Sequence, residues 1–259
     1  MRFRRATIAC ALAVLAVYGL LIVSLFYFFD GTAILEALSS KRVLFSIQLS
    51  LVAATVATGL ALAVAVPAAY ALSRYHFRGR ELVDAILEFP IIVSPAALGA
   101  IILIFFSNPV GEWVQEHVLQ FVFAFAGVVL AQFITTLGVA VRFMKSAFDQ
   151  VPTSYEMVAR TLGATPARAF FTVSLRLAGR GLLASGVLTW AKALGEFGAT
   201  IMVAGTMAMR TETLPIAIYM RLSTADIKGT VALILVLLAL GLSALYLAKF
   251  FFRERRART

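Results

Sequence analysis

The sequence predicts an all-α integral membrane protein with six transmembrane helices. Of its 259 residues, 61% are hydrophobic, and the mean hydropathy is +0.94. Both values exceed those of an ordinary soluble domain. Several segments hold about 20 apolar residues, the length with which a helix crosses about 30 Å of hydrocarbon. We expect residues 1–259 to form a single membrane domain, because no soluble segment is long enough to fold alone.

The six expected spans follow the apolar runs of the chain. They cover about residues 7–29, 46–72, 89–106, 121–143, 181–204 and 229–252. The first run is longer than the core of a signal peptide and no A-x-A cleavage pattern follows it, so we expect a membrane helix there. The second span has alanine at every fourth position from Ala53 to Ala69, a pattern that allows helices to pack closely. Pro67, Pro90 and Pro95 can bend or break the second and third spans.

The distribution of basic residues predicts the topology. The formal net charge is +10 and the pI is about 10.3, values that also occur in proteins that bind nucleic acid. With both termini in the cytoplasm, however, most of the 23 lysines and arginines fall on the cytoplasmic side. The outer side receives only Lys41, Arg42, Arg210, Arg221 and Lys228. This asymmetry is the positive-inside rule, so we expect no nucleic-acid partner.

The sequence offers few groups for catalysis. Cys10 is the only cysteine and there are two histidines, so a protein-built transition-metal site is not expected. No G-x-x-x-x-G-K-[ST] motif occurs, which excludes ATP hydrolysis on the usual phosphate-binding loop. The motifs H-E-x-x-H and G-x-S-x-G are also absent. We predict no catalytic residues and no cofactor in this chain.

One pair of charges lies within an expected span. Lys192 and Glu196 are four residues apart, so on one helix they share a face and can neutralise each other. Charged side chains at this depth usually face the bundle interior or an aqueous path. The pair is either part of a translocation path or a structural pair. Thr135, Thr136 and Thr200 are further candidates for lining such a path.

Residues 151–178 form a basic interlude between two spans, and we expect two short helices joined by a tight turn. Thr153 and Glu156 have the spacing of a capping box. Gly163 can adopt the left-handed conformation that ends a helix. Thr165 can then cap a second helix that starts at Pro166. That second helix carries a basic stripe suited to lipid headgroups or an acidic protein surface, formed by Arg168, Thr172, Arg176 and Arg180.

This interlude resembles the cytoplasmic EAA loop of ABC-importer permeases, in which E-A-A and Gly are followed by I-x-L-P. Glu156, Ala159 and Gly163 match the first part, and VSLR at 173–176 lies ten residues beyond Gly163. Glu156 stands seven rather than six residues before the glycine, and Arg176 replaces the proline. The segments ARTLGATPARAFFTVSL (159–175), LGEFGATIMVAG (194–205) and RTETLPIAIY (210–219) are similar to the molybdate-importer permease and its sulfate and tungstate relatives.

The resemblance implies a type I ABC importer permease that forms a homodimer around a central path in a bacterial inner or archaeal cell membrane. A separate P-loop ATPase, which carries ATP and magnesium, would bind the EAA loop. A periplasmic or extracellular binding protein would deliver the oxyanion, with molybdate first and sulfate or tungstate as alternatives. The implied ATPase-coupling residues are Thr153, Glu156, Ala159, Arg160, Gly163, Ala164, Thr165 and Pro166.

A second class of function is a stand-alone secondary transporter. It would require inverted repeats, broken helices in both halves, or several ionisable groups within the membrane. The sequence offers one such pair and no internal repeat. The sequence therefore favours the importer permease.

Overall fold

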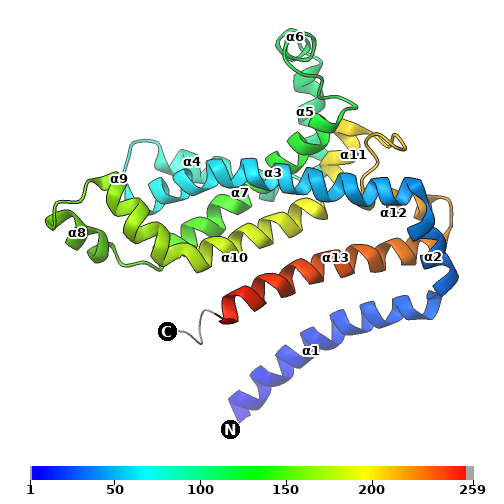
Figure 1. The fold of residues 1–259 in the computed structure, drawn as a ribbon, viewed down its shortest axis with the longest axis horizontal. Helices are drawn as coiled ribbons and strands as arrows, with labels where there is room; N and C mark the ends of the chain where they lie inside the picture. The colour runs from blue at the N-terminus through cyan, green and yellow to red at the C-terminus, as the bar shows by residue number, and fades with distance from the viewer. Residues whose placement is uncertain (1, 255–259) are drawn as a thin grey trace.

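The computed structural model describes residues 2–254, and all regular elements in this range are helices (Figure 1). In chain order they are α1 (Arg2–Leu25), η1 (Phe26–Phe28), α2 (Gly31–Ser39), α3 (Lys41–Arg74), α4 (Arg80–Ile92), α5 (Pro95–Phe106), α6 (Pro109–His117), α7 (Phe125–Asp149), α8 (Thr153–Thr161), α9 (Pro166–Ala169), η2 (Phe170–Ser174), α10 (Leu175–Leu194), α11 (Gly198–Ala204), α12 (Leu214–Ser223) and α13 (Ile227–Glu254). In this part of the chain, four helices are long and apolar enough to cross a membrane, or six if two bent pairs each count as one span.

The second span is a single helix of 34 residues, longer than the predicted 46–72. Pro67 lies inside α3 without ending it. The alanine ladder is buried as predicted, since all five of its members from Ala53 to Ala69 have no exposed surface. Ala65 and Ala69 belong to the core that includes Met144 and Phe148 of α7. Ala53 and Ala57 pack with Val128 and Val129 of α7 in the same way, so small side chains let α3 and α7 pack closely along their length.

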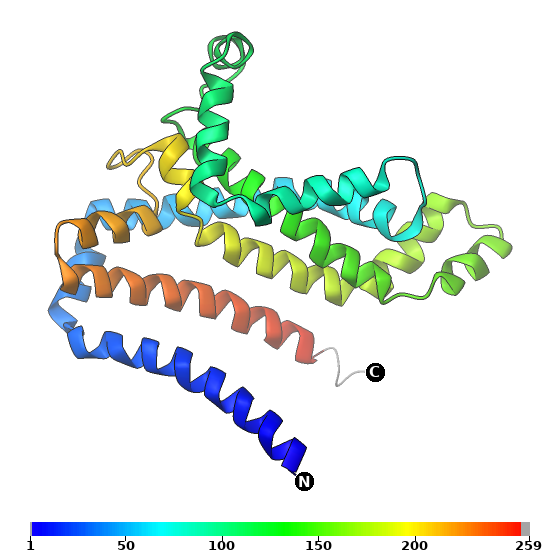
Figure 2. The ribbon, with the colours of Figure 1, turned by 180° about the vertical axis from the view of Figure 1, so that it is seen from behind.

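The third span is not one straight helix over 89–106. α4 and α5 meet at an angle of 110°, and the far end of α5 projects from the bundle with α6 at its tip (Figures 1 and 2). The break falls before Pro95, whose ring disfavours a helical conformation at Ser94. Ser94 instead caps α5 by accepting a hydrogen bond from the Ala97 amide at 3.3 Å. α5 packs closely on α11, because a Cβ at Gly99 would lie 2.9 Å from the Ala199 Cα.

The fifth span is also interrupted. Residues 166–194 are helical throughout and contain a π-helical turn at Phe170–Ser174. The expected span 181–204 then breaks after Leu194, and α11 continues at an angle of 54°. The basic stripe is exposed as predicted. Elsewhere on this helix, Phe170 packs inward whereas Leu177 is exposed.

The two ends of the molecule are distinct. α8 lies at one end, together with the start of α1 and the end of α13, whereas α2 and α12 lie at the opposite end (Figure 1). α1 runs apart from the main bundle in both views (Figures 1 and 2), and the apolar window of this span is 0% buried.

Candidate functional site

The turn after α8 has the predicted conformation. Gly163 has a φ of +89°, a region that strains any residue with a Cβ. The Thr165 hydroxyl accepts a hydrogen bond from the Arg168 amide at 3.3 Å, and Pro166 takes the first helical position of α9. The left-handed glycine and the second cap are therefore confirmed.

The predicted capping box at the start of α8 is wrong. The residue in the cap position is Pro152, which has no side-chain acceptor, and the Thr153 side chain makes no capping bond. Glu156 does not reach back to the helix start but binds the guanidinium of Arg74 at the end of α3. Both partners of this hydrogen bond are charged, whereas the backbone amide at the helix start is neutral.

Glu156 accepts three hydrogen bonds from other elements. Arg74 Nε and Ser174 Oγ lie 2.7 and 2.5 Å from its Oε1, and the Tyr70 hydroxyl lies 2.9 Å from its Oε2. The side chains of Arg74 and Glu156 are only 6% and 13% exposed. Burial by itself raises the pKa of the Glu156 carboxyl, but the bonds from Ser174, Arg74 and Tyr70 outweigh it and leave this pKa below its usual value. Glu156 is therefore a charged acceptor at neutral pH.

Arg74 extends this cluster to the end of α7. Its Nη2 donates to the carbonyls of Phe148 and Val151 at 3.0 and 2.8 Å. The Phe170 ring, at the start of η2, packs against Tyr70 with ring centroids 4.6 Å apart. One buried ion pair thus joins α3, α7, α8 and the π-helical turn. We name Tyr70, Arg74, Glu156 and Ser174 the α8 anchor.

Sequence reasoning singled out only one member of the α8 anchor. Arg74 is one of the basic residues that predict the topology, Ser174 lies in the VSLR segment matched to the EAA loop without a role of its own, and nothing marks Tyr70. A useful signal was available in the Tyr-x-x-x-Arg spacing at the end of α3, because residues four apart project from one helix face.

The opposite face of α8 is open and partly apolar. Tyr155, Met157 and Val158 are exposed, and Leu162 at the turn is 83% exposed. Arg160 is also exposed, whereas Ala159 is half-buried. Apolar side chains that gather on an exposed surface are typical of a contact with another protein. The site therefore has a buried side that fixes α8 and an exposed side available to a partner.

The predicted pair of Lys192 and Glu196 does not form. Lys192 is exposed, whereas Glu196 is 5% exposed and accepts a hydrogen bond from the Ala199 amide at 3.1 Å. The helical register that would align them ends at Leu194, and the Glu196 side chain instead caps the first turn of α11 from the position before Phe197, the residue in the cap position.

The three threonines of the predicted path are buried. Thr135 and Thr136 donate to carbonyls of their own helix, those of Ala131 and Gln132. The Thr200 hydroxyl is buried and has no hydrogen-bond partner among the described residues. α7 and α11 contact each other through Ala131, Ala199 and Val203. These threonines lie inside the subunit, and a path beside them stays a prediction.

A second buried carboxylate lies at the other end of α3. Glu212, in the segment that leads into α12, is 2% exposed and binds Arg42 through two bonds of 2.7 and 2.9 Å. The same segment is held by the Ser50 hydroxyl, which accepts from the Leu214 amide at 2.7 Å. The sequence analysis placed Glu212 in a motif but gave it no role.

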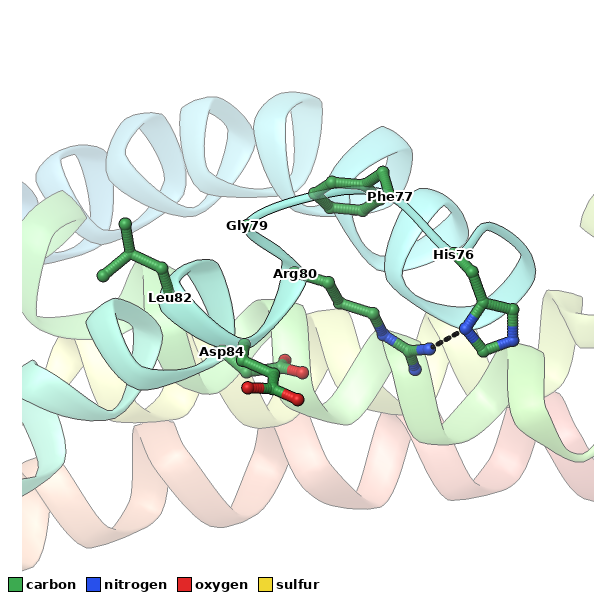
Figure 3. Close-up of a pocket in the computed structure, with 7 residues that line it drawn as sticks. His76, Phe77, Gly79, Arg80, Leu82 and Asp84 are labelled. Carbon is green, nitrogen blue, oxygen red and sulfur yellow. Dashed lines mark hydrogen bonds between the residues drawn. The ribbon is translucent and has the colours of Figure 1, made fainter.

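A concave region also lies on the connection between α3 and α4 (Figure 3). His76 and Arg80 line it side by side and are hydrogen bonded, with Nδ1 and Nη1 3.0 Å apart. Glu81 and Asp84 lie on the same region, so it presents no single sign of charge. Among residues 2–254 no group of three or more His, Cys, Asp or Glu side chains could hold a metal ion.

Comparison with known proteins identifies the family. Residues 61–257 match the family of binding-protein-dependent transport system inner membrane components. A probable molybdenum ABC transporter permease protein of Haloferax volcanii is 38% identical over 232 residues, which cover 88% of this chain and 84% of that protein. The sulfate transport system permease protein CysT of Escherichia coli is 30% identical over 213 residues, or 82% of this chain and 77% of that protein.

The fold agrees with these relatives. A chain of a bacterial alginate ABC transporter, solved in complex with an alginate-bound periplasmic protein, superposes with a TM-score of 0.77. The match covers 97% of this chain and 96% of that one at 14% identity, so it concerns the fold alone. It confirms the predicted type I importer fold, and the relatives confirm the resemblance to permeases. This multi-pass membrane protein therefore belongs to the family of binding-protein-dependent transport system inner membrane components.

Proposed function

We propose that this chain is the permease subunit of an ATP-driven importer that moves an oxyanion, molybdate first, into the cytoplasm. The observation that carries the proposal is α8, a short helix that is anchored by Glu156 on one side and exposes apolar side chains on the other. This arrangement suits a helix that a second protein holds and moves. The family match supports it, because members of this family are the membrane components of binding-protein-dependent systems.

The ATPase would be a separate P-loop subunit that carries ATP and magnesium, so this chain would not itself be an enzyme. It would hold Tyr155, Met157, Val158 and Leu162 in an apolar cleft, with Arg160 at the rim. Closure of the ATPase dimer would displace α8 and rock the membrane helices between outward-facing and inward-facing states. Such closure can shift the equilibrium only through contacts that differ between the two states.

The topology that fits this role places α8 and both termini in the cytoplasm and α2 and α12 outside. The chain would work as a homodimer in a bacterial inner or archaeal cell membrane, and a periplasmic or extracellular binding protein would deliver the anion. The exposed arginines of α9 and α10, Arg168 and Arg176, would lie at the level of the lipid headgroups.

Molybdate leads because a molybdenum permease is 38% identical to this chain, and sulfate is the second candidate because CysT is 30% identical. Both are tetrahedral dianions, so a path for one suits the other, and the binding protein would choose between them. Tungstate belongs to the same chemical class.

Reconstitution tests the proposal. The permease should co-purify with a separate P-loop ATPase subunit. In liposomes that also contain the binding protein, molybdate should stimulate ATP hydrolysis and enter the lumen. A chain that binds no ATPase, or that transports without one, would point to a stand-alone secondary transporter. Calorimetry of the binding protein with molybdate, sulfate and tungstate would assign the anion.

Gly163→Pro tests the coupling segment, because proline cannot adopt the φ of +89° found there. ATPase association and transport should both be lost. Gly79→Pro is the matched control, since Gly79 has the same φ of +89° in the loop between α3 and α4. If Gly163→Pro leaves association and transport intact, α8 is not the coupling element.

A further inference from the structure

α3 is held at each end by a buried carboxylate from a distant part of the chain. At its start, Arg42 binds Glu212 through two parallel hydrogen bonds, a geometry that fixes orientation as well as distance. At its end, Arg74 binds Glu156 of α8. The two arginines are 32 residues apart, so about 48 Å of helix separates the two ion pairs.

The helix between these ion pairs is built to move as one piece. α3 has no break between Lys41 and Arg74, and its alanine ladder is buried along its length. Pro67 removes one backbone hydrogen bond of α3 but does not end it, so the two ion pairs lie on one continuous helix. The outer ion pair holds the segment that connects α11 to α12, so a shift of that segment reaches α3 through Glu212.

Ser50 adds a second outer contact on the same face. Arg42, Ser46 and Ser50 are spaced by four residues and thus form one stripe, which faces the start of α12. Ser50 accepts from the Leu214 amide, two residues after Glu212. The connection from α11 to α12 is therefore fixed to α3 at two successive points.

We propose that α3 is a rigid link between the outer segment at 205–213 and α8, and that Arg42 and Glu212 are positioning residues for coupling. Docking of a loaded binding protein at the outer end would shift this segment, and α3 would pass the shift through Arg74 and Glu156 to the ATPase. The inference rests on the proposed function, because it requires an ATPase at α8. Its physical basis is a continuous chain of contacts between two sites.

Glu212→Gln in the reconstituted complex is the first test, because it removes the charge but keeps the size of the side chain. The fold-stimulation of ATP hydrolysis by binding protein and molybdate should fall about tenfold, within the usual span of allosteric coupling. Basal hydrolysis and co-purification should remain. Arg221→Gln is the matched control: it breaks an outer ion pair with Asp226 that does not involve α3, and stimulation should persist.

A double variant tests whether the ion pairs at the two ends of α3 act in one link or on two separate routes. If α3 is a single link, Glu212→Gln together with Glu156→Gln loses no more stimulation than the worse single variant. If the fractional losses of the two single variants multiply in the double variant, the inference is wrong. It is also wrong if Glu212→Gln retains full stimulation. If Arg42 and Glu212 only stabilise the fold, stimulation should follow the melting temperature across Arg42→Lys, Arg42→Gln and Glu212→Gln. That result would also overturn the inference. A wild-type chain that binds no ATPase would instead refute the proposed function.

Discussion

The Tyr70 hydroxyl donates to Glu156 Oε2 at 2.9 Å, and so ties the last turn but one of a membrane helix to a helix outside the bundle. The Tyr70 ring meanwhile packs on Phe148 and Phe170. One side chain thus contributes to the core of the bundle and to the α8 anchor.

Tyr70→Phe removes this hydrogen bond and keeps the ring contacts. Glu156 retains two other donors, so we expect a loss of roughly 1–2 kcal/mol in the free energy of unfolding. Denaturant unfolding of the purified protein in detergent would measure it. Tyr18→Phe is the control, because Tyr18 is 65% exposed on α1 and should change stability little. Equal losses in both variants would show that the hydroxyl of Tyr70 contributes nothing specific.

The lowered pKa of Glu156 predicts the pH dependence of stability. Because the folded-state pKa lies below the unfolded value, the ion pair contributes fully above the unfolded value, 4.5 in the reference state. This contribution is lost as the pH falls through the folded-state pKa. The stability difference between the wild type and Glu156→Gln should therefore be largest at neutral pH and shrink below about pH 4. A difference that stays constant into acid would contradict this assignment.

Close packing of α5 on α11 predicts a strong effect of a single methyl group. In Gly99→Ala the new Cβ would lie 2.7 Å from the Met202 Cβ and 2.9 Å from the Ala199 Cα. We expect overpacking to cost about 1–3 kcal/mol. Gly59→Ala, in α3, has open space around the new methyl and should be neutral or stabilising. Thermal unfolding of the two variants would compare them directly.

Lys192 and Glu196 should contribute independently to stability. Glu196→Ala removes the cap of α11 and should cost about 1 kcal/mol, while Lys192→Ala should change little because this side chain is exposed. In a double-mutant cycle the interaction energy should stay within roughly 0.5 kcal/mol of zero. A larger interaction energy would show that the ion pair predicted from the four-residue spacing does form.

These residues also show what the sequence could predict. Gly163, Thr165 and Pro166 were assigned correctly, because turn and cap preferences depend on the local backbone. The spans were found because hydrophobic length is also a local property. The two breaks were harder: Pro95 marked the first as a candidate, but only the packing of α5 on α11 sets the angle.

The partner of Glu156 could not be predicted from local sequence patterns. Its spacing from Thr153 satisfied a capping rule, yet a buried arginine 82 residues earlier in the chain was the stronger donor. Glu212 and Arg42, 170 residues apart, pose the same difficulty. Ion pairs between residues so far apart in the sequence depend on which helices become neighbours in the fold. A short sequence pattern does not contain this information. The pairing of Lys192 with Glu196 failed for the opposite reason, because the helix that would align them ends between them.

The π-helical turn at Phe170–Ser174 divides one continuous helix into two registers. An inserted residue rotates everything before it by about 100° relative to everything after it. Within this turn, Ser174 donates to Glu156 and the Phe170 ring packs on Tyr70, which is itself hydrogen bonded to Glu156. The helical segments before and after the turn, α9 and α10, can therefore present different faces, because a change of one residue in this turn resets their relative phase.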